Sequence, residues 1–221
     1  LARYLGVPLV EGSDLTVRDD RLYLKTLAGL EPVHALLRRL DDEYCDPLEL
    51  RSDSALGVPG LLAAARAGNL LLANALGTGW LESPALHGFL PAIARQLLGQ
   101  DLLLPSLPSW WCGEQAALDD ALVDLSQHVL KPSYPTADFE PVIFAGLDAG
   151  ALQQWRQRIA ADPQRYTLQD YLPLSQTPVW EERHLLPRSC MLRVFAMADG
   201  MGGWQVLPGG LGRTAGGDRD V

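Results

Sequence analysis

Short apolar runs separated by polar turns open the chain and predict strands. The first run covers residues 5–12, and two more cover residues 15–17 and 22–24. The polar residues 18–21 between the last two are typical of a hairpin turn. A further apolar run at 33–40 ends in a cluster of charged side chains. We therefore expect the beginning of the chain to be rich in short strands.

Helices are predicted where an alanine- and leucine-rich stretch follows a proline. Residues 57–66 and 85–98 have this pattern, and the second stretch ends at Gly99, a residue typical of helix C-termini. The apolar run 70–75 lies between them and predicts a strand. Such an alternation of strands and helices is typical of an α/β unit.

Beyond residue 108 the strands are expected to be antiparallel, which indicates an α+β unit. The predicted elements are two helices, at 113–127 and 149–161, and two strands, at 128–132 and 166–172. A proline-rich stretch at 101–108 separates them from the first part. We therefore predict two domains, an α/β domain over residues 1–108 and an α+β domain over residues 109–221.

The last apolar runs predict a β-hairpin. Residues 191–198 and 203–207 flank Asp199-Gly200, which suits a tight turn. Pro208-Gly209-Gly210 follows directly and is expected to end the second strand.

The composition allows a folded protein and excludes some functions. Of the 221 residues 48% are hydrophobic, enough for a sizeable core. The formal net charge of −9 argues against a general nucleic-acid binder, because phosphate backbones require a basic field. A nucleotide needs only a few local cations and backbone N–H groups, so it stays open. No apolar run approaches the roughly 18 residues of a membrane span.

Neither a disulfide framework nor a metal site is expected. The three cysteines, Cys45, Cys112 and Cys190, are widely spaced and odd in number, as expected for buried, reduced thiols of a cytoplasmic protein. The four histidines show no spacing typical of metal ligands, so we predict no metal-binding residue in this chain.

Several long and irregular blocks of the sequence resemble the circularly permuted ATP-grasp type 2 family. The blocks are LVEGSDLTVRD at 9–19, RRLDDEYCDPLELRSDSALGVPGL at 38–61, AGNLLLANALGTGWLESPAL at 67–86, PSWWCGE at 108–114, VLKP at 129–132, DPQRYTLQDYLPLSQTPVW at 162–180, LRVFAM at 192–197 and LPGGLGRTA at 207–215. The resemblance covers nearly the whole chain. Some members of this family are distantly similar to glutathionylspermidine synthase, in the ATP-grasp ligase superfamily.

The resemblance implies a circularly permuted ATP-grasp fold and an ATP-dependent carboxylate–amine ligase. In such an enzyme ATP, with Mg²⁺, phosphorylates a carboxylate, and an amine then attacks the acyl phosphate. The family implies that residues 1–108 form a substrate domain and that residues 109–221 form a nucleotide-binding subdomain, truncated at its end. It also implies small-molecule or peptide acids and amines as substrates, and a helical alpha-E domain as a partner.

The magnesium ligands are expected outside this chain. In the permuted family the carboxylates and the asparagine that hold Mg²⁺ lie before the region seen here. We therefore expect both ends of the chain to be cuts in a longer protein, and the chain alone to be inactive.

Three residues are candidates for the nucleotide. Lys131 ends an apolar strand beside Pro132, and the resemblance places it at a lysine that contacts the phosphates of ATP. Gln169 and Asp170 lie where the family meets the edge of the adenine. The alternative for these two is that they are ordinary polar residues at a strand end.

Two arginines are candidates for catalysis. Arg193 lies within an apolar strand, where a charge must pair with another charge or face a cleft. Arg213 follows the Pro-Gly-Gly sequence, and the resemblance places it close to a site. Both are expected to stabilise charge on the transferred phosphoryl group, with a structural salt bridge as the alternative for Arg193.

A dense cluster of charges is the candidate site for the acceptor substrate. It consists of Arg38, Arg39, Asp41, Asp42 and Asp46, at the end of an apolar run. In α/β sheets, ligands bind at the carboxyl ends of the strands. The alternative is a surface network of charges that pair with one another.

One departure from the family favours a second function. Many ATP-grasp proteins close a glycine-rich loop over the phosphates, whereas here the segment 133–146 contains no glycine before Gly146. Without glycine it lacks the flexibility of such a loop. The alternative function is therefore a catalytically inactive interaction or scaffold module with an ATP-grasp fold. A third possibility is a cleft for another phosphorylated molecule.

Overall fold

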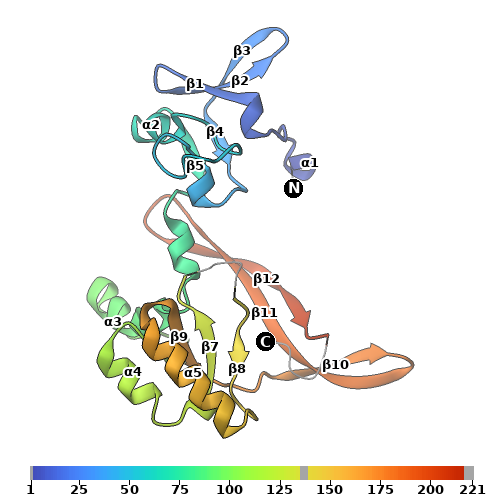
Figure 1. The fold of residues 1–221 in the computed structure, drawn as a ribbon. Helices are drawn as coiled ribbons and strands as arrows, with labels where there is room; N and C mark the ends of the chain where they lie inside the picture. Colours follow the sequence, from blue (N-terminus) through green and yellow to red (C-terminus); the bar gives the residue numbers. More distant parts are fainter. Residues whose placement is uncertain (1, 135–138, 217–221) are drawn as a thin grey trace.

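A computed structural model of the protein describes residues 2–134 and 139–216 (Figure 1). It is a mixed α/β structure with several small sheets and few helices. The elements from α1 to β5 lie at the top of Figure 1, and those from α3 onward form a second assembly below, from which a long arm of strands projects. Among the described residues, no helix has the length and apolar character that crossing a membrane requires.

The chain opens with a short helix and a three-stranded antiparallel sheet. Helix α1 spans Ala2–Leu5, and strands β1 (Leu15–Arg18), β2 (Arg21–Thr26) and β3 (Gly29–Val33) follow in the order β1-β2-β3. Asp19 and Asp20 form the turn between β1 and β2, both at positive φ, so the predicted hairpin is confirmed. The strand predicted over residues 5–12 is wrong, because α1 extends to Leu5 and residues 7–11 pair with no other strand.

A parallel strand pair with a helix in the connection completes the first part. Strands β4 (Ala35–Leu37) and β5 (Leu71–Ala73) pair in parallel, and helix α2 (Leu61–Arg66) lies between them in the sequence. The alternation of helix and strand predicted for residues 57–75 is therefore confirmed. The sheet residues and α2 share one buried apolar cluster, formed by Leu15, Leu22, Cys45, Val58, Leu61, Ala64 and Leu70.

The second part contains a four-stranded antiparallel sheet. Its strands are β6 (Ser109–Trp111), β7 (His128–Pro132), β8 (Val142–Ile143) and β9 (Tyr166–Asp170), in the order β6-β9-β7-β8. The predicted strand at 128–132 and the predicted antiparallel arrangement are confirmed. The strand predicted over residues 166–172 is two residues shorter than expected.

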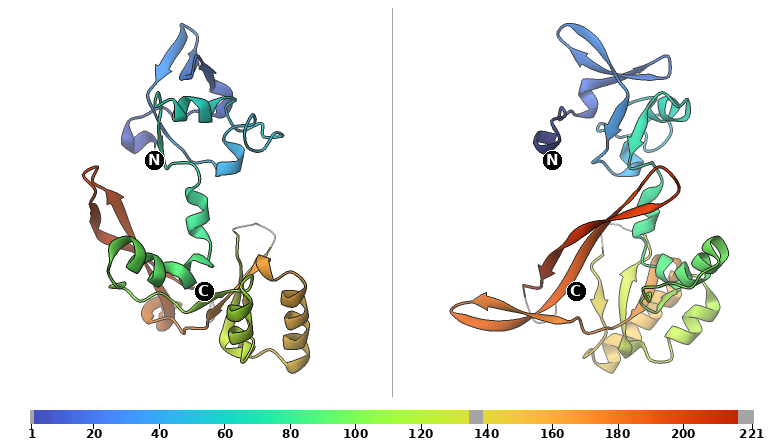
Figure 2. Two further views of the ribbon diagram at one scale, coloured as in Figure 1. Left: turned by 90° about the vertical axis from the view of Figure 1, so that its left-hand side faces the viewer. Right: turned by 180° about the vertical axis from the view of Figure 1, so that it is seen from behind.

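Helices α4 (Gln115–Ala121) and α5 (Ala149–Ala161) lie side by side against one face of this sheet (Figure 2). Their apolar residues join Leu130 and Leu168 of the sheet in a second buried cluster. The prediction for α5 is confirmed. The helix predicted over residues 113–127 is much shorter, because the carboxylate of Asp124 accepts the N–H of Ser126 and starts a separate turn.

The 3-10 helix Thr78–Glu82 connects the two parts, and helix α3 (Leu86–Leu98) follows it within the second part (Figure 1). Helix α3 ends at Gly99, whose φ of 65° is left-handed, so the predicted helix and its end are confirmed. Gly88 in α3 lies directly against β6, since a Cβ placed there would come within 2.5 Å of the carbonyl oxygen of Ser109. The two buried clusters draw on residues 15–70 and 112–168, while the division into two domains at residue 108 stays a prediction.

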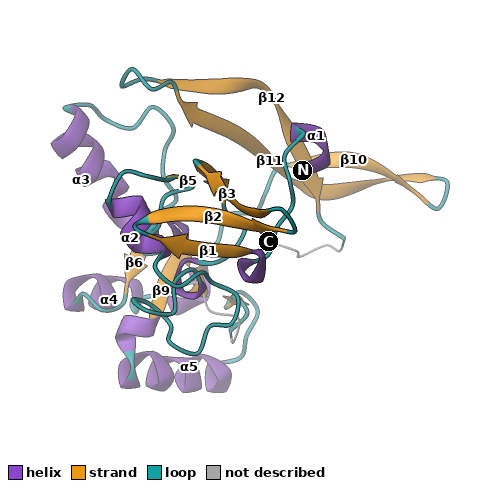
Figure 3. Ribbon diagram, turned by 90° about the horizontal axis from the view of Figure 1, so that it is seen from above, coloured by secondary structure: helices purple, strands orange, loops and turns teal. Residues whose placement is uncertain are grey.

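A three-stranded antiparallel arm follows the second sheet. Strands β10 (Gln176–Glu181), β11 (His184–Ala198) and β12 (Trp204–Thr214) pair in that order, and the arm projects to one side of the helices (Figure 3). The predicted hairpin is confirmed, although its strands are longer than expected.

The prediction that Pro208-Gly209-Gly210 ends the second strand of the hairpin is wrong. The strand continues past them, since Val194 pairs with Gly210 and Ala196 pairs with Val206. Residues 207–209 therefore form a bulge opposite Phe195. Gly209 has a φ of 152°, a conformation that favours glycine.

All three cysteines are free. Cys45 and Cys112 are buried, as predicted, whereas Cys190 in the arm is only partly buried. Burial raises the pKa of the Cys112 thiol to about 11, so this thiol is inert at neutral pH.

Candidate functional site

One face of the second sheet carries the candidate nucleotide residues. In the strand register, Thr167 of β9 pairs with both Lys131 of β7 and Trp111 of β6. Residues directly opposite each other in antiparallel strands point to the same face. Trp111, Thr167 and Lys131 therefore form one row across three strands. The adjacent row on the same face contains Gln169, so the structure brings Lys131 and Gln169 together on one surface.

Lys131 is a half-buried cation. Burial disfavours its charged form and lowers the pKa of its ammonium group. Within the described residues it has neither an ion pair nor a side-chain hydrogen bond. A buried charge without a counter-ion is unfavourable, and a bound anion removes that cost. The position therefore suits a phosphate.

Gln169 is buried and held in place. Its Nε2 donates a hydrogen bond of 2.9 Å to the Oγ of Ser109 on the neighbouring strand β6. This contact fixes the amide group on the face that Lys131 occupies.

Asp170 points to the opposite face. It pairs across the ladder with His128, and its Oδ1 lies 3.2 Å from the Nδ1 of His128. The angles are not those of a hydrogen bond, and the buried Nδ1 has no hydrogen-bond partner among the described residues. The structure therefore does not bring the carboxylate of Asp170 to Lys131.

Three hydroxyl groups beside Lys131 were not predicted from the sequence. The Oγ of Ser83 donates to the carbonyl oxygen of Ser133, and the hydroxyls of Ser133 and Thr167 lie 2.9 Å apart. All three residues are buried. The available signal was a threonine within an apolar strand, which indicates a buried hydroxyl that needs a partner.

The two candidate arginines lie on one face of the arm. Met191 pairs with Arg213 and Arg193 pairs with Leu211, so Arg193 and Arg213 are diagonal neighbours on the same face. Neither has an ion pair within residues 2–134 and 139–216, so the structural salt bridge considered for Arg193 is not seen there.

In the acceptor cluster, Arg38 and Asp42 are engaged with the protein itself. Arg38 donates to the carbonyl oxygens of Leu40, Asn74 and Ala75, and its Nη2 lies 2.5 Å from the Oδ1 of Asp42. The other carboxylate oxygen of Asp42 accepts the N–H groups of two loop glycines, Gly77 and Gly79. These contacts favour the alternative of a self-paired network for Arg38 and Asp42.

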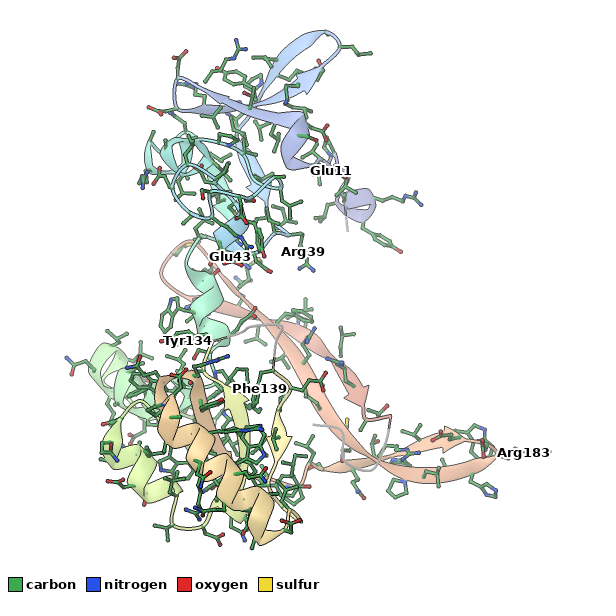
Figure 4. All side chains as sticks on the ribbon, in the orientation of Figure 1. Glu11, Arg39, Glu43, Tyr134, Phe139 and Arg183 are labelled. Atoms are coloured by element: carbon green, nitrogen blue, oxygen red, sulfur yellow. The ribbon has the colours of Figure 1, made fainter. Side chains whose placement is uncertain are left out.

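Two further members of the cluster, Arg39 and Asp41, are exposed. Figure 4 shows Arg39 near Glu43 at the lower edge of the first part. Arg39 and Asp41 have no ion pair among the residues that the structure describes, and both side chains reach solvent. They are the members of the cluster that remain available to a ligand.

Asp46 was also predicted to belong to this acceptor cluster, and that prediction is wrong, because Asp46 is fully buried and has a structural role. Its carboxylate accepts the N–H groups of Leu48, Gly60 and Leu62 at 3.0–3.1 Å. Since α2 begins at Leu61, Asp46 holds the start of that helix.

Metal-ligating side chains do not form a cluster in the described part of the chain. Within residues 2–134 and 139–216, no three side chains of His, Cys, Asp or Glu come together in a way that would hold a metal ion. Mg²⁺ at a nucleotide is commonly held by one or two carboxylates together with phosphate oxygens and water.

Comparison with known proteins identifies the family of this chain. The family model of circularly permuted ATP-grasp type 2 matches residues 1–215. The chain is 38% identical over 215 residues to the uncharacterized protein Rv2411c of Mycobacterium tuberculosis, covering 97% of this chain and 39% of that protein.

Two further relatives come from other bacteria. The uncharacterized protein ML0605 of Mycobacterium leprae is 36% identical over 97% of this chain and 38% of its own length. The uncharacterized protein sll0335 of Synechocystis is 34% identical over 97% of this chain and 44% of its own length. The chain thus spans less than half the length of these relatives. The match to the family model over almost all residues shows that the chain belongs to the circularly permuted ATP-grasp type 2 family.

Proposed function

We propose that the chain is the nucleotide-binding part of an ATP-dependent ligase that joins a carboxylic acid to an amine through an acyl phosphate. The observation that carries the proposal is Lys131. It is a half-buried cation with no partner among the described residues, on a face shared with Thr167 and Gln169, in a chain of an ATP-grasp family. A phosphate at this position would stabilise the charged form of the lysine.

The proposed chemistry has two steps. A carboxylate oxygen of the acid attacks the γ-phosphorus of ATP, the bond to the β-phosphate oxygen breaks, and ADP leaves. The amine nitrogen then attacks the acyl carbon, phosphate leaves, and the amine proton passes to water. Cations that contact the phosphoryl oxygens lower the barrier of the first step. We assign Lys131, Arg193 and Arg213 to this role, the arginines because they share one face of the arm.

The geometry keeps some of the other candidate residues in the proposed sites and removes one. Gln169 stays in the proposed adenine site, because its amide group shares the face of Lys131. Asp170 is left out of the proposed adenine site, because it lies beside His128 on the opposite face of the sheet. Arg39 and Asp41 remain the proposed contacts of the acceptor substrate.

Magnesium would neutralise the phosphate charges of ATP. Since the described residues lack a set of metal ligands, we place those ligands outside them, in the part of the longer protein that this chain does not cover.

Calorimetric titration of ATP, with magnesium, into the full-length protein tests the proposal. We expect Lys131→Ala to weaken binding at least about tenfold, which is about 1.4 kcal/mol. The matched control is Lys25→Ala, because Lys25 is exposed on β2, far along the chain from this sheet. A folded wild-type protein that binds no ATP would contradict the proposal.

A specific observation also supports a non-catalytic scaffold as the second candidate. The segment 133–146 has no glycine before Gly146, although residues 135–138 lie outside the described part. If ATP binds as expected, but no acid and amine promote release of ADP, the scaffold becomes the better reading. Release of ADP that depends on both substrates would exclude it.

A further inference from the structure

A small apolar pocket lies beside the row that contains Lys131. Its volume is about 220 Å³. The walls come from the 3-10 helix Thr78–Glu82, the start of α3, β6 and the residues after β7. The residues that line it are Trp80, Ser83, Ala85, Leu86, Phe89, Trp111, Ser133 and Tyr134. Figure 4 labels Tyr134 at the junction between the two parts of the chain.

The strand register fixes where this pocket lies relative to Lys131. Trp111 is in the same row as Lys131, separated from it by Thr167, so the two are about 10 Å apart across two strand spacings. Ser133, which also lines the pocket, follows Lys131 in the chain and contacts Thr167. The wall that β6 gives to the pocket and Lys131 therefore lie on the same face of the sheet.

The pocket and the proposed adenine end lie on opposite sides of Lys131. Along β9, Thr167 marks the row of Lys131, and the strand ends three residues later at Asp170, about 10 Å away. In the other direction, β7 runs past Lys131 to Ser133 and Tyr134 at the pocket. A nucleotide with its base at the Asp170 end and its phosphates at Lys131 points its terminal phosphate toward the pocket.

The size of the pocket limits what it holds. An apolar cavity of about 150 Å³ is large enough for benzene, so 220 Å³ accommodates one aromatic ring or a branched aliphatic group. It is too small for a whole nucleotide, since sites for drug-sized ligands measure about 300–1,000 Å³. The aromatic rings of Trp80, Phe89 and Trp111 favour an apolar, preferably aromatic, occupant.

We propose that this pocket binds the apolar side chain of the acid substrate, so that the acid carries an aromatic or branched aliphatic group next to its carboxylate. The inference rests on the proposed ligase function. The carboxylate must reach the terminal phosphate, and the distance of about 10 Å between Trp111 and Lys131 leaves room for both groups. The pocket therefore selects the acid, while Lys131 holds the phosphate that the acid attacks.

Calorimetry with two acids of equal charge tests this selection. N-acetyl-L-phenylalanine and N-acetylglycine are titrated into the full-length protein saturated with a non-hydrolysable ATP analogue and magnesium. We expect the aromatic acid to bind at least tenfold more tightly. Ala85→Phe fills the pocket and should abolish this preference, while ATP binding stays unchanged. Ala92→Phe is the matched control, because Ala92 is exposed on the same helix, and it should keep the preference.

The outcomes separate the two proposals. Equal binding of both acids, or no binding of either, overturns the pocket inference while ATP binding that depends on Lys131 still supports the ligase. Loss of the preference in both Ala85→Phe and Ala92→Phe also overturns the pocket inference, since the effect would then not be local to the pocket. Absence of ATP binding together with a preference that only Ala85→Phe removes overturns the ligase and supports recognition of the aromatic acid alone.

Discussion

The charged side chains of Asp46 and Lys131 lie in opposite environments. Asp46 is fully buried, and three backbone N–H groups satisfy its carboxylate. Lys131 is half-buried and lacks a partner among the described residues. The first arrangement stabilises the fold, whereas the second costs free energy until an anion binds. This contrast separates a structural charge from a charge available to a ligand.

Replacing Asp46 should therefore destabilise the protein strongly. Asp46→Ala removes the acceptor of three N–H groups and leaves them buried, at a cost of about 2–3 kcal/mol. The free energy of unfolding, measured by urea denaturation, should fall by that amount. Asp53→Ala is the control: its side chain is 72% exposed, and we expect a change within about 0.5 kcal/mol. Equal effects of the two substitutions would contradict the assigned role of Asp46.

Removing the charge of Lys131 should stabilise the folded chain and weaken its proposed binding of ATP. Burial lowers the pKa of Lys131 below its ordinary value of 10.5, so the folded state binds its proton less tightly than the unfolded state. The penalty is complete at neutral pH and disappears as the pH rises toward 10.5. We expect Lys131→Met to raise the melting temperature by about 1–2 °C at pH 7.

The pH dependence of this difference is the check on its cause. The gap in melting temperature between Lys131→Met and the wild type should narrow as the pH rises toward 10.5, because the folded wild-type protein loses the proton of Lys131 before the unfolded chain does. A gap that stays constant over this range would show that better packing of methionine, rather than the lost charge, stabilises the variant.

The residue scale also shows what sequence alone can predict. Once residues 166–170 are read as a strand, its period of two places Gln169 and Asp170 on opposite faces, so they cannot serve one adenine with both side chains. The match of Lys131 with Thr167 and Trp111 requires the strand register, which depends on pairing across 36 and 56 residues of chain. Local patterns do not contain that information.

At the scale of elements, the sequence predicted those helices whose ends are set by neighbouring residues in the chain. Helix α3 has a proline near its start and a glycine at its end, and α5 has Asp148 as N-cap, whose carboxylate accepts the N–H of Ala151. The arm was predicted too short, because Pro208 and Gly209 are normally strand breakers. Long-range pairing with β11 absorbs them in a bulge instead.

That bulge gives a prediction for the arm. Gly209 has a φ of 152°, which a side chain disfavours, so Gly209→Ala should cost about 1–2 kcal/mol locally. Hydrogen exchange of the amides in β11 and β12 should become roughly 5–30 times faster. Gly212→Ala on the same strand is the control, because its φ is not in the left-handed region and nothing lies within 4 Å of an added Cβ. Similar exchange in both variants would show that the bulge does not need glycine.

At the scale of the whole molecule, the arm stands apart from the two buried clusters. Its apolar residues point outward on both faces, and Leu192, Trp204 and Met197 are each about 70% exposed. Exposed apolar patches of this kind are typical of surfaces that contact other protein. The relatives are more than twice as long as the region that this chain matches.

The isolated chain should therefore associate through the arm. Val194 and Val206 lie on one face of β11 and β12 and are 57% and 64% exposed. Replacing both by lysine should leave the fold of the isolated chain intact, because neither side chain is buried, and should remove an apolar contact surface. We expect the wild-type chain to show a sedimentation coefficient that rises with concentration, and the double variant to sediment as a monomer.

The control must separate apolar area from charge. Leu103→Lys with Leu104→Lys adds the same two positive charges at leucines that are 96% and 83% exposed in the loop after α3, outside the arm. If the arm drives association, this control should associate like the wild type. Loss of association in both double variants would attribute the effect to net charge, since added like charge also keeps proteins apart. A wild-type chain that stays monomeric as its concentration rises would show that the exposed face of the arm is not adhesive.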